Sequence, residues 1–205
     1  MSIHRVLPSA MRIAGGGLLL AVSVWLGGCT AMTAQNPDTT LRPVNAVAVA
    51  AAPRLMLKGA DVTAYFTQGK YVQGSAEFHS QHQGVDFHFA SAQAKALFVQ
   101  DPARYLPQFG GYCADGLVYA IPWGGDADTW KLIDGKLYIF GGQGSKDAFE
   151  LEEPQNVALA QQYWREEVQG THSFYQRAKR LVWRVPHYKS GEELAKRVAA
   201  AKAKP

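Results

Sequence analysis

Cysteine is nearly absent from this chain, whose 205 residues contain only Cys29 and Cys113. Cys29 closes an apolar leader, so a domain that folds after it keeps one thiol and has no partner for an internal disulfide. An excess of one charge is lacking too, because 17 acidic residues offset the 21 Lys and Arg residues. No basic stripe interleaved with aromatic residues is present, so nucleic acid is not an expected partner.

Residues 1–28 have the layout of a bacterial lipoprotein signal peptide. A short basic segment precedes the apolar stretch IAGGGLLLAVSVWL, which is too short and glycine-rich for a comfortable membrane span. The stretch ends in Leu26-Gly27-Gly28-Cys29, which resembles a lipobox, and the Cys29 thiol is the group that a diacylglycerol would modify. The alternative is an apolar leader that contains a cysteine by chance. We expect lipidation of Cys29 and a membrane partner through that anchor.

The residues after Cys29 indicate where the protein resides. Thr30 follows the cysteine, and by the enterobacterial sorting rule this favours the outer membrane, facing the periplasm, within the bacterial cell envelope. Residues 29–54 are rich in Ala, Thr, Pro and Asn and show no helical periodicity. They therefore predict a flexible tether.

From residue 55 onward the pattern predicts an α+β domain of hairpins and short helices. Gln83-Gly84 separates two strand-like stretches, and Asp134-Gly135 suits a tight turn between strands at 130–133 and 136–140. Ser91 is expected to cap a helix that ends at Pro102. A further strand is expected over 117–123.

The remaining sequence predicts helices. Residues 156–169 carry apolar side chains at helical spacing, and a further helix is expected with its cap at Thr171. The last segment, 191–205, is helix-prone, basic and expected to be loosely held. We place the domain at 55–168 and a C-terminal helical extension at 169–205.

Between Gly59 and Phe140 the chain resembles the YHS-domain proteins in their secreted bacterial form. The resemblance covers about 80 residues. The matching stretches are GADVTAYF (59–66), GVDFHFAS (84–91), DPARYLPQFGGYCADG (101–116) and WKLIDGKLYI (130–139). It implies a small α+β domain, and for members that carry two cysteines it implies a role in metal binding.

This chain departs from the metal-linked members at their cysteines. Those members read F-C-S-x-x-C before the helix, whereas this chain has Phe89-Ala90-Ser91-Ala92-Gln93-Ala94. The thiolate pair that would hold copper or zinc is therefore absent, and any metal site must be built from other residues.

Cys113 is the thiol left in the domain, and several interpretations of it stay open. With His82 and His88, which flank the hairpin turn, it would form a Cys/His ligand set suited to copper or zinc. It could equally be a small buried apolar group or a redox-active or dimer-forming thiol. His88 shares a strand face with Asp86, so a solvated pair is the alternative for that residue. Some aromatic residues, Trp123 among them, could line a cleft around Cys113.

Three functions follow from these residues. The leading hypothesis is an envelope lipoprotein whose YHS-like module binds copper or another soft transition metal without catalysing a reaction. The second is a structural or protein-interaction module that has lost the metal site. The third is an enzyme that uses Cys113 as a nucleophile, which needs a depressed thiol pKa and a base within reach.

Overall fold

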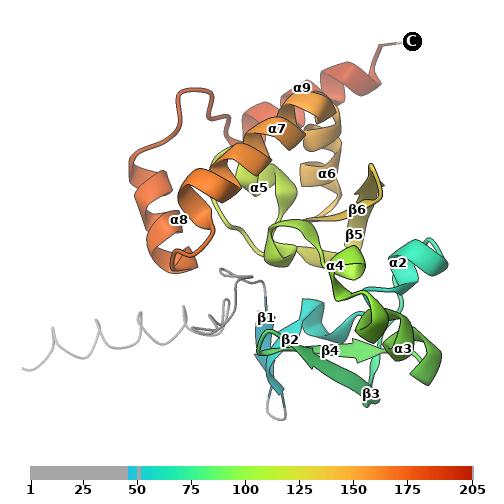
Figure 1. The fold of residues 1–205 in the computed structure, drawn as a ribbon. Helices are drawn as coiled ribbons and strands as arrows, with labels where there is room; N and C mark the ends of the chain where they lie inside the picture. The colour runs from blue at the N-terminus through green and yellow to red at the C-terminus, as the bar shows by residue number, and fades with distance from the viewer. Residues whose placement is uncertain (1–45, 50–51, 205) are drawn as a thin grey trace, which may run out of the picture. The chain divides into compact units, whose positions relative to one another are not determined.

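The computed structural model describes residues 46–49 and 52–204, which form an α+β fold (Figure 1). The predicted signal peptide (1–28) and the predicted lipidation site Cys29 lie outside the described residues. Among the residues that are described, no helix has the length and apolar character needed to cross a membrane.

The first sheet has four strands in the order β1-β2-β4-β3, with β2 and β4 parallel and the other neighbours antiparallel. Its β3–β4 hairpin turns at Gln83-Gly84 as predicted, and both turn residues have positive φ. Strands β1 and β2 begin inside the segment expected to be a tether. The strands are β1 (Ala46–Val49), β2 (Ala52–Met56), β3 (Ser75–His82) and β4 (Val85–Phe89).

Short helices connect and cover this sheet. The predicted Ser91 cap is confirmed, because its side chain accepts a hydrogen bond from the Ala94 amide at the start of α3. Phe98 of α3 packs against Phe87 and Phe89 of β4, with ring centroids 4.6 and 5.2 Å apart. The elements are the 3₁₀ turn η1 (Leu57–Gly59), α2 (Ala64–Thr67), α3 (Ala92–Gln100) and α4 (Pro102–Tyr105).

The second sheet is the hairpin of β5 (Asp126–Ile133) and β6 (Lys136–Phe140), which turns at Asp134-Gly135 as predicted. The strand expected over 117–123 is wrong. Residues Ala114–Val118 form the short helix α5, and the Ile121 amide closes it by donating to the Gly116 carbonyl. Residues 114–122 are all buried, and a fully buried run shows no periodicity that separates strand from helix.

The C-terminal half is helical, and in Figure 1 its helices gather around α5 and the β5–β6 hairpin. The cap of α8 is His172 and not the predicted Thr171, because the His172 ring accepts from the Phe174 amide. Helix α9 is tied down by the ion pairs Arg197–Glu152 and Lys202–Asp147. The elements are α6 (Gln143–Glu150), α7 (Glu153–Tyr163), the π-helical turn η3 (Trp164–Val168), α8 (Ser173–Val182) and α9 (Gly191–Lys202).

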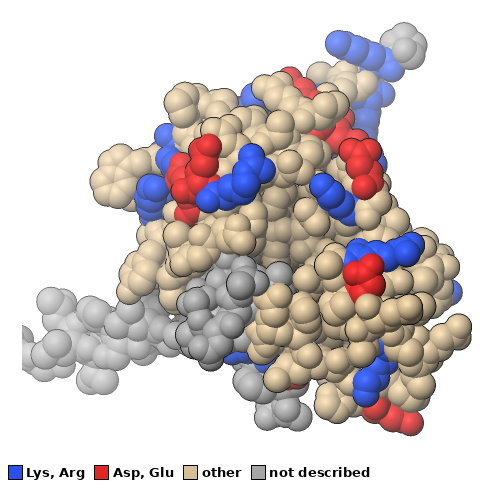
Figure 2. Space-filling view, in the orientation of Figure 1, with Lys and Arg blue, Asp and Glu red and all other residues tan. Residues whose placement is uncertain are grey.

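Strand β6 joins two hydrophobic cores. Its residues Leu137 and Ile139 belong to the core under the first sheet, and Tyr138 and Phe140 belong to the core under the C-terminal helices. Side chains that alternate along a strand point to opposite faces, so β6 is buried on both sides. On the face drawn in Figure 2 the charged groups lie in small clusters of mixed sign, as expected from ion pairs such as Lys131–Glu150.

Asp61 is a fully buried carboxylate that fixes the first core. It accepts hydrogen bonds from the Thr63 amide and hydroxyl at 2.9 and 2.7 Å and from the Ala90 amide at 2.9 Å. Together these bonds attach the turn before α2 to the end of β4.

We expect Asp61→Ala to lower the free energy of unfolding by about 3 kcal/mol, because it leaves buried donors without acceptors. Urea unfolding followed by circular dichroism measures the loss. The control is Asp101→Ala, which removes an exposed cap of α4 and should cost about 1 kcal/mol. Equal losses in both variants would contradict the role assigned to Asp61.

Candidate functional site: a buried carboxyl and thiol beneath helix α9

The segment before α5 runs alongside β6 and places Cys113. Isolated parallel bridges join Pro107 to Leu137 and Cys113 to Ile139. Between them the chain forms the 3₁₀ turn η2 (Gln108–Gly111), in which Gly110 and Gly111 have φ of 59° and 80°. Glycine adopts such angles without steric cost, so this pair is a turn of the fold, as the sequence indicates.

Cys113 is a buried thiol at the N-cap of α5, with 3% of its surface exposed. Burial raises the pKa of the thiol, and the nearby Asp115 carboxyl raises it further. Hydrogen bonds to the sulfur from the Gly116 and Gly141 amides and from the Ser145 hydroxyl act in the opposite direction. The pKa of the thiol remains above its usual value, so Cys113 is neutral at neutral pH. Its burial is as expected for a small buried group, one of the interpretations that the sequence left open.

Asp115 is the unusual group at this site. The residue is 8% exposed, and no hydrogen bond or ion pair of its carboxyl group is found among the described residues. Burial raises its pKa to about 7, and no neighbouring cation lowers it. A buried carboxyl without a partner is costly, and natural proteins keep few of them.

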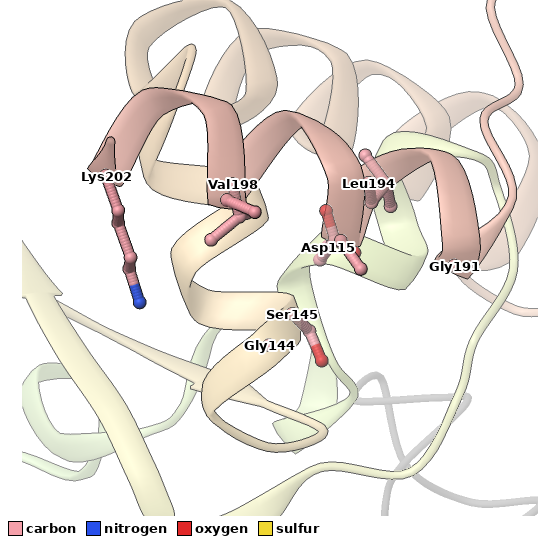
Figure 3. A pocket seen from close by; sticks show the side chains of 9 residues that line it. Asp115, Gly144, Ser145, Gly191, Leu194, Val198 and Lys202 are labelled. Atoms are coloured by element: carbon pink, nitrogen blue, oxygen red, sulfur yellow. The ribbon is translucent and has the colours of Figure 1, made fainter. Parts of the chain in front are cut away.

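The carboxyl faces a cavity of about 290 Å³ whose walls come from distant parts of the chain. The cavity adjoins a second one of about 420 Å³ beneath α9, and the two share Asp115, Ser145, Gly191 and Leu194. In Figure 3 Asp115 lies between α5 and α9, with Ser145 of α6 beside it. The first cavity is also lined by Cys113, the aromatic residues Tyr119, Trp123 and Tyr188, and Lys189.

The aromatic wall of the cavity is held by its own contacts. The Tyr119 and Tyr188 rings meet edge to face at 5.4 Å. His187, the residue before Tyr188, hydrogen-bonds through Nε2 to the Val118 carbonyl at 2.9 Å and so fixes the segment that carries Tyr188. Gly116 lets Trp123 approach α5, because a Cβ at position 116 would lie 2.6 Å from the Ile121 carbonyl oxygen and 3.0 Å from Trp123 Cδ1.

The predicted metal ligands are not brought together. The antiparallel register pairs His88 with His79, whereas His82 pairs with Val85 and its ring packs against Phe98. Burial, and then His79, lower the pKa of His88. Within residues 46–49 and 52–204, no group of three His, Cys, Asp or Glu side chains is placed to hold a metal ion. The set Cys113, His82 and His88 is therefore corrected: Cys113 lies beside β6 and not at the β3–β4 hairpin.

Comparison of the chain with family models, with curated proteins and with solved structures found no match.

The sequence indicated part of this site and missed its central residue. Trp123 lines the cavity next to Cys113, where aromatic residues were expected from the sequence. Asp115 gave no signal, because an acidic residue next to glycine has the usual composition of an exposed turn. Its burial depends on α9, whose sequence lies some 80 residues further along the chain.

Asp115 should make stability depend on pH. Its folded pKa is about 7 and its ordinary value is 3.8, so between these values the unfolded chain releases this proton and the folded chain keeps it. Its contribution to stability therefore falls as the pH rises from about 4 to 7 and is constant above that range.

We expect Asp115→Asn to raise the free energy of unfolding of the ligand-free chain above that of the parent. The difference should grow as the pH rises and reach about 4 kcal/mol at pH 8. Urea unfolding of both proteins between pH 4.5 and 8 gives the difference, with Asp126→Asn at an exposed position as the control. A difference for Asp115→Asn that stays flat across this range would contradict the burial of an unpaired carboxyl.

The thiol at this site should be unreactive. A neutral, buried Cys113 should be alkylated by iodoacetamide at pH 7.5 far more slowly in the native chain than in urea, because the thiolate is the nucleophile. Peptide mass mapping follows position 113 separately from position 29. Fast alkylation of native Cys113 would instead favour the thiol-dependent enzyme.

Proposed function

We propose that this protein is a lipid-anchored lipoprotein of the bacterial envelope whose YHS-like domain binds a small cationic organic ligand in the cavity beside Asp115. The observation that carries the proposal is Asp115, a residue that is 8% exposed, whose carboxyl group has no hydrogen bond or ion pair among the described residues and borders a cavity. A ligand that carries an amino or quaternary ammonium group would supply the missing partner.

The charge of the ligand follows from the electrostatics of the cavity. A buried carboxylate is stabilised by an opposite charge placed within a few ångströms. Lys189 lines the same cavity, yet it forms no ion pair with Asp115 and is not among the causes of the Asp115 pKa. The chain therefore leaves room for an external cation next to this carboxyl.

The walls suit the same class of ligand. Tyr119, Trp123 and Tyr188 present aromatic surface, and aromatic faces attract organic cations, Trp most strongly. Two of these rings already contact cations: the Arg177 guanidinium lies 5.8 Å from the Trp123 ring centroid, and that of Arg184 lies 4.4 Å from the Tyr188 centroid. Buried carboxylate and aromatic walls together discriminate against anions.

A transition metal remains the second candidate, because Cys113 and Asp115 border the same cavity. Cysteine sulfur suits Cu(I) or Zn(II). No third His, Cys, Asp or Glu side chain completes a metal site among the described residues, so a metal here would need further ligands of another kind. The third candidate, a protein-interaction module, depends on the C-terminal helices and is compatible with an occupied cavity.

The probes for the cationic ligand are putrescine and choline, measured by isothermal titration calorimetry on the full chain. We expect binding about tenfold tighter at pH 8 than at pH 6, because the ionised fraction of a carboxyl with a pKa near 7 changes by that factor. Asp115→Asn should abolish binding of both probes, and Asp126→Asn should leave it unchanged.

Two outcomes separate the candidates. Dialysis against Cu(I), Cu(II) and Zn(II) that gives stoichiometric uptake lost in Cys113→Ala, with no uptake of either amine, would favour the metal. No binding of amines or metals, in a chain whose folding is verified by circular dichroism, would leave the protein-interaction module as the surviving function. Mass spectrometry of the mature chain tests the lipid on Cys29 independently.

A further inference from the structure

Helix α8 is amphipathic, but it buries its polar side and exposes its apolar side, the opposite of an ordinary surface helix. The side chains that it buries are polar: Ser173 and Gln176 are almost fully buried, and Arg177 is 8% exposed. The exposed side includes its large apolar residues, and the next residue, Trp183, is exposed as well. The exposed fractions are 41% for Phe174, 70% for Tyr175, 49% for Leu181, 69% for Val182 and 68% for Trp183.

The polar contacts fix this orientation. Gln176 donates a hydrogen bond to the Ala120 carbonyl at 3.0 Å, in the loop after α5. Lys179 pairs with Glu167 at 2.9 Å, and Arg180 pairs with the same carboxylate. Helix α8 therefore cannot rotate its apolar side inward without breaking a buried hydrogen bond and two ion pairs.

The apolar side forms one continuous stripe. At 3.6 residues per turn, Phe174, Leu181, Val182 and Tyr175 fall within about 120° of the helix circumference. Five of the eight large hydrophobic residues that are exposed in the described part of the chain lie between positions 174 and 183. Apolar surface concentrated in this way marks an interaction site.

The charges beside the stripe identify the partner. Residues 173–189 contain five basic residues and no acidic one: Arg177, Lys179, Arg180, Arg184 and Lys189. Arg177 is buried against the Trp123 ring, and Lys189 borders the cavity. Lys179 and Arg180 share the single carboxylate of Glu167, and Arg184 is exposed, so these three basic residues leave an excess of positive charge near the stripe. Apolar and aromatic side chains next to Lys and Arg are typical of helices that lie in the interface of an anionic bilayer.

We propose that α8 and Trp183 dock on an anionic lipid surface, with the stripe at the level of the headgroups and upper acyl chains. Trp and Tyr favour this depth because their rings are amphipathic. The docking is additional to the lipid anchor proposed for Cys29, which would keep α8 near a bilayer, and it is independent of the ligand cavity.

The test uses the fluorescence of the full chain on phosphatidylglycerol vesicles with brominated acyl chains, which quench a Trp ring at that depth. We expect quenching that is largely lost in Trp183→Phe and retained in Trp130→Phe, the matched control at a half-buried tryptophan of β5. Val182→Glu, on the exposed stripe, should reduce it too. Phosphatidylcholine vesicles or high salt should weaken it, because the attraction to the headgroups is electrostatic.

Equal quenching in the parent and in Trp183→Phe would overturn the proposal, because the chain would then be held by its anchor alone. Self-association of the parent without vesicles, lost in Val182→Glu and seen by sedimentation velocity, would overturn it in favour of a second copy of the chain. Putrescine binding is measured on separate samples without vesicles. The proposal for the cavity and the proposal for α8 can therefore fail independently of each other.

Discussion

The burial of β6 on both faces is the constraint on which the rest of the structure depends. A five-residue strand in a two-stranded hairpin has little stability of its own, so each face must be covered by other elements. Leu137 and Ile139 meet the first core and Tyr138 and Phe140 meet the second. The segment 107–113 lies beside the same strand through its bridges, so the position of Cys113 follows from that of β6.

The cavity is formed where α9 covers α5 and α6, and its formation costs free energy because it buries Asp115. Closing α9 over α5 and α6 takes Asp115 out of water without supplying a hydrogen-bond donor or a cation. Two ion pairs, Arg197–Glu152 and Lys202–Asp147, hold the C-terminal half of α9, and each includes an exposed side chain, so each contributes little. A fold that only needed a core would do better with an apolar residue at 115, and this is the reason for assigning the carboxyl to a ligand.

Local signals were readable from the sequence, and contacts between distant segments were not. The turns at Gln83-Gly84 and Asp134-Gly135 and the Ser91 cap each depend on a few neighbouring residues, and all three are confirmed. The same two-residue turn pairs 82 with 85 and hence 79 with 88, so the separation of His82 from His88 follows from the hairpin itself. The helix at 114–118 could not be recognised, because its burial by distant segments removes the polar face that marks a helix.

The segment 169–205, expected to be a C-terminal helical extension, contributes to the cavity and to the packing around it. Helix α9 supplies one wall of the cavity, and Gln176 of α8 satisfies the Ala120 carbonyl after α5. The segment therefore belongs to the same folded unit as the cavity, although it lies beyond the resemblance. Because α8 uses its polar side for this attachment, its apolar side is left outward, so the contact that holds the helix in place also creates the surface assigned to the bilayer.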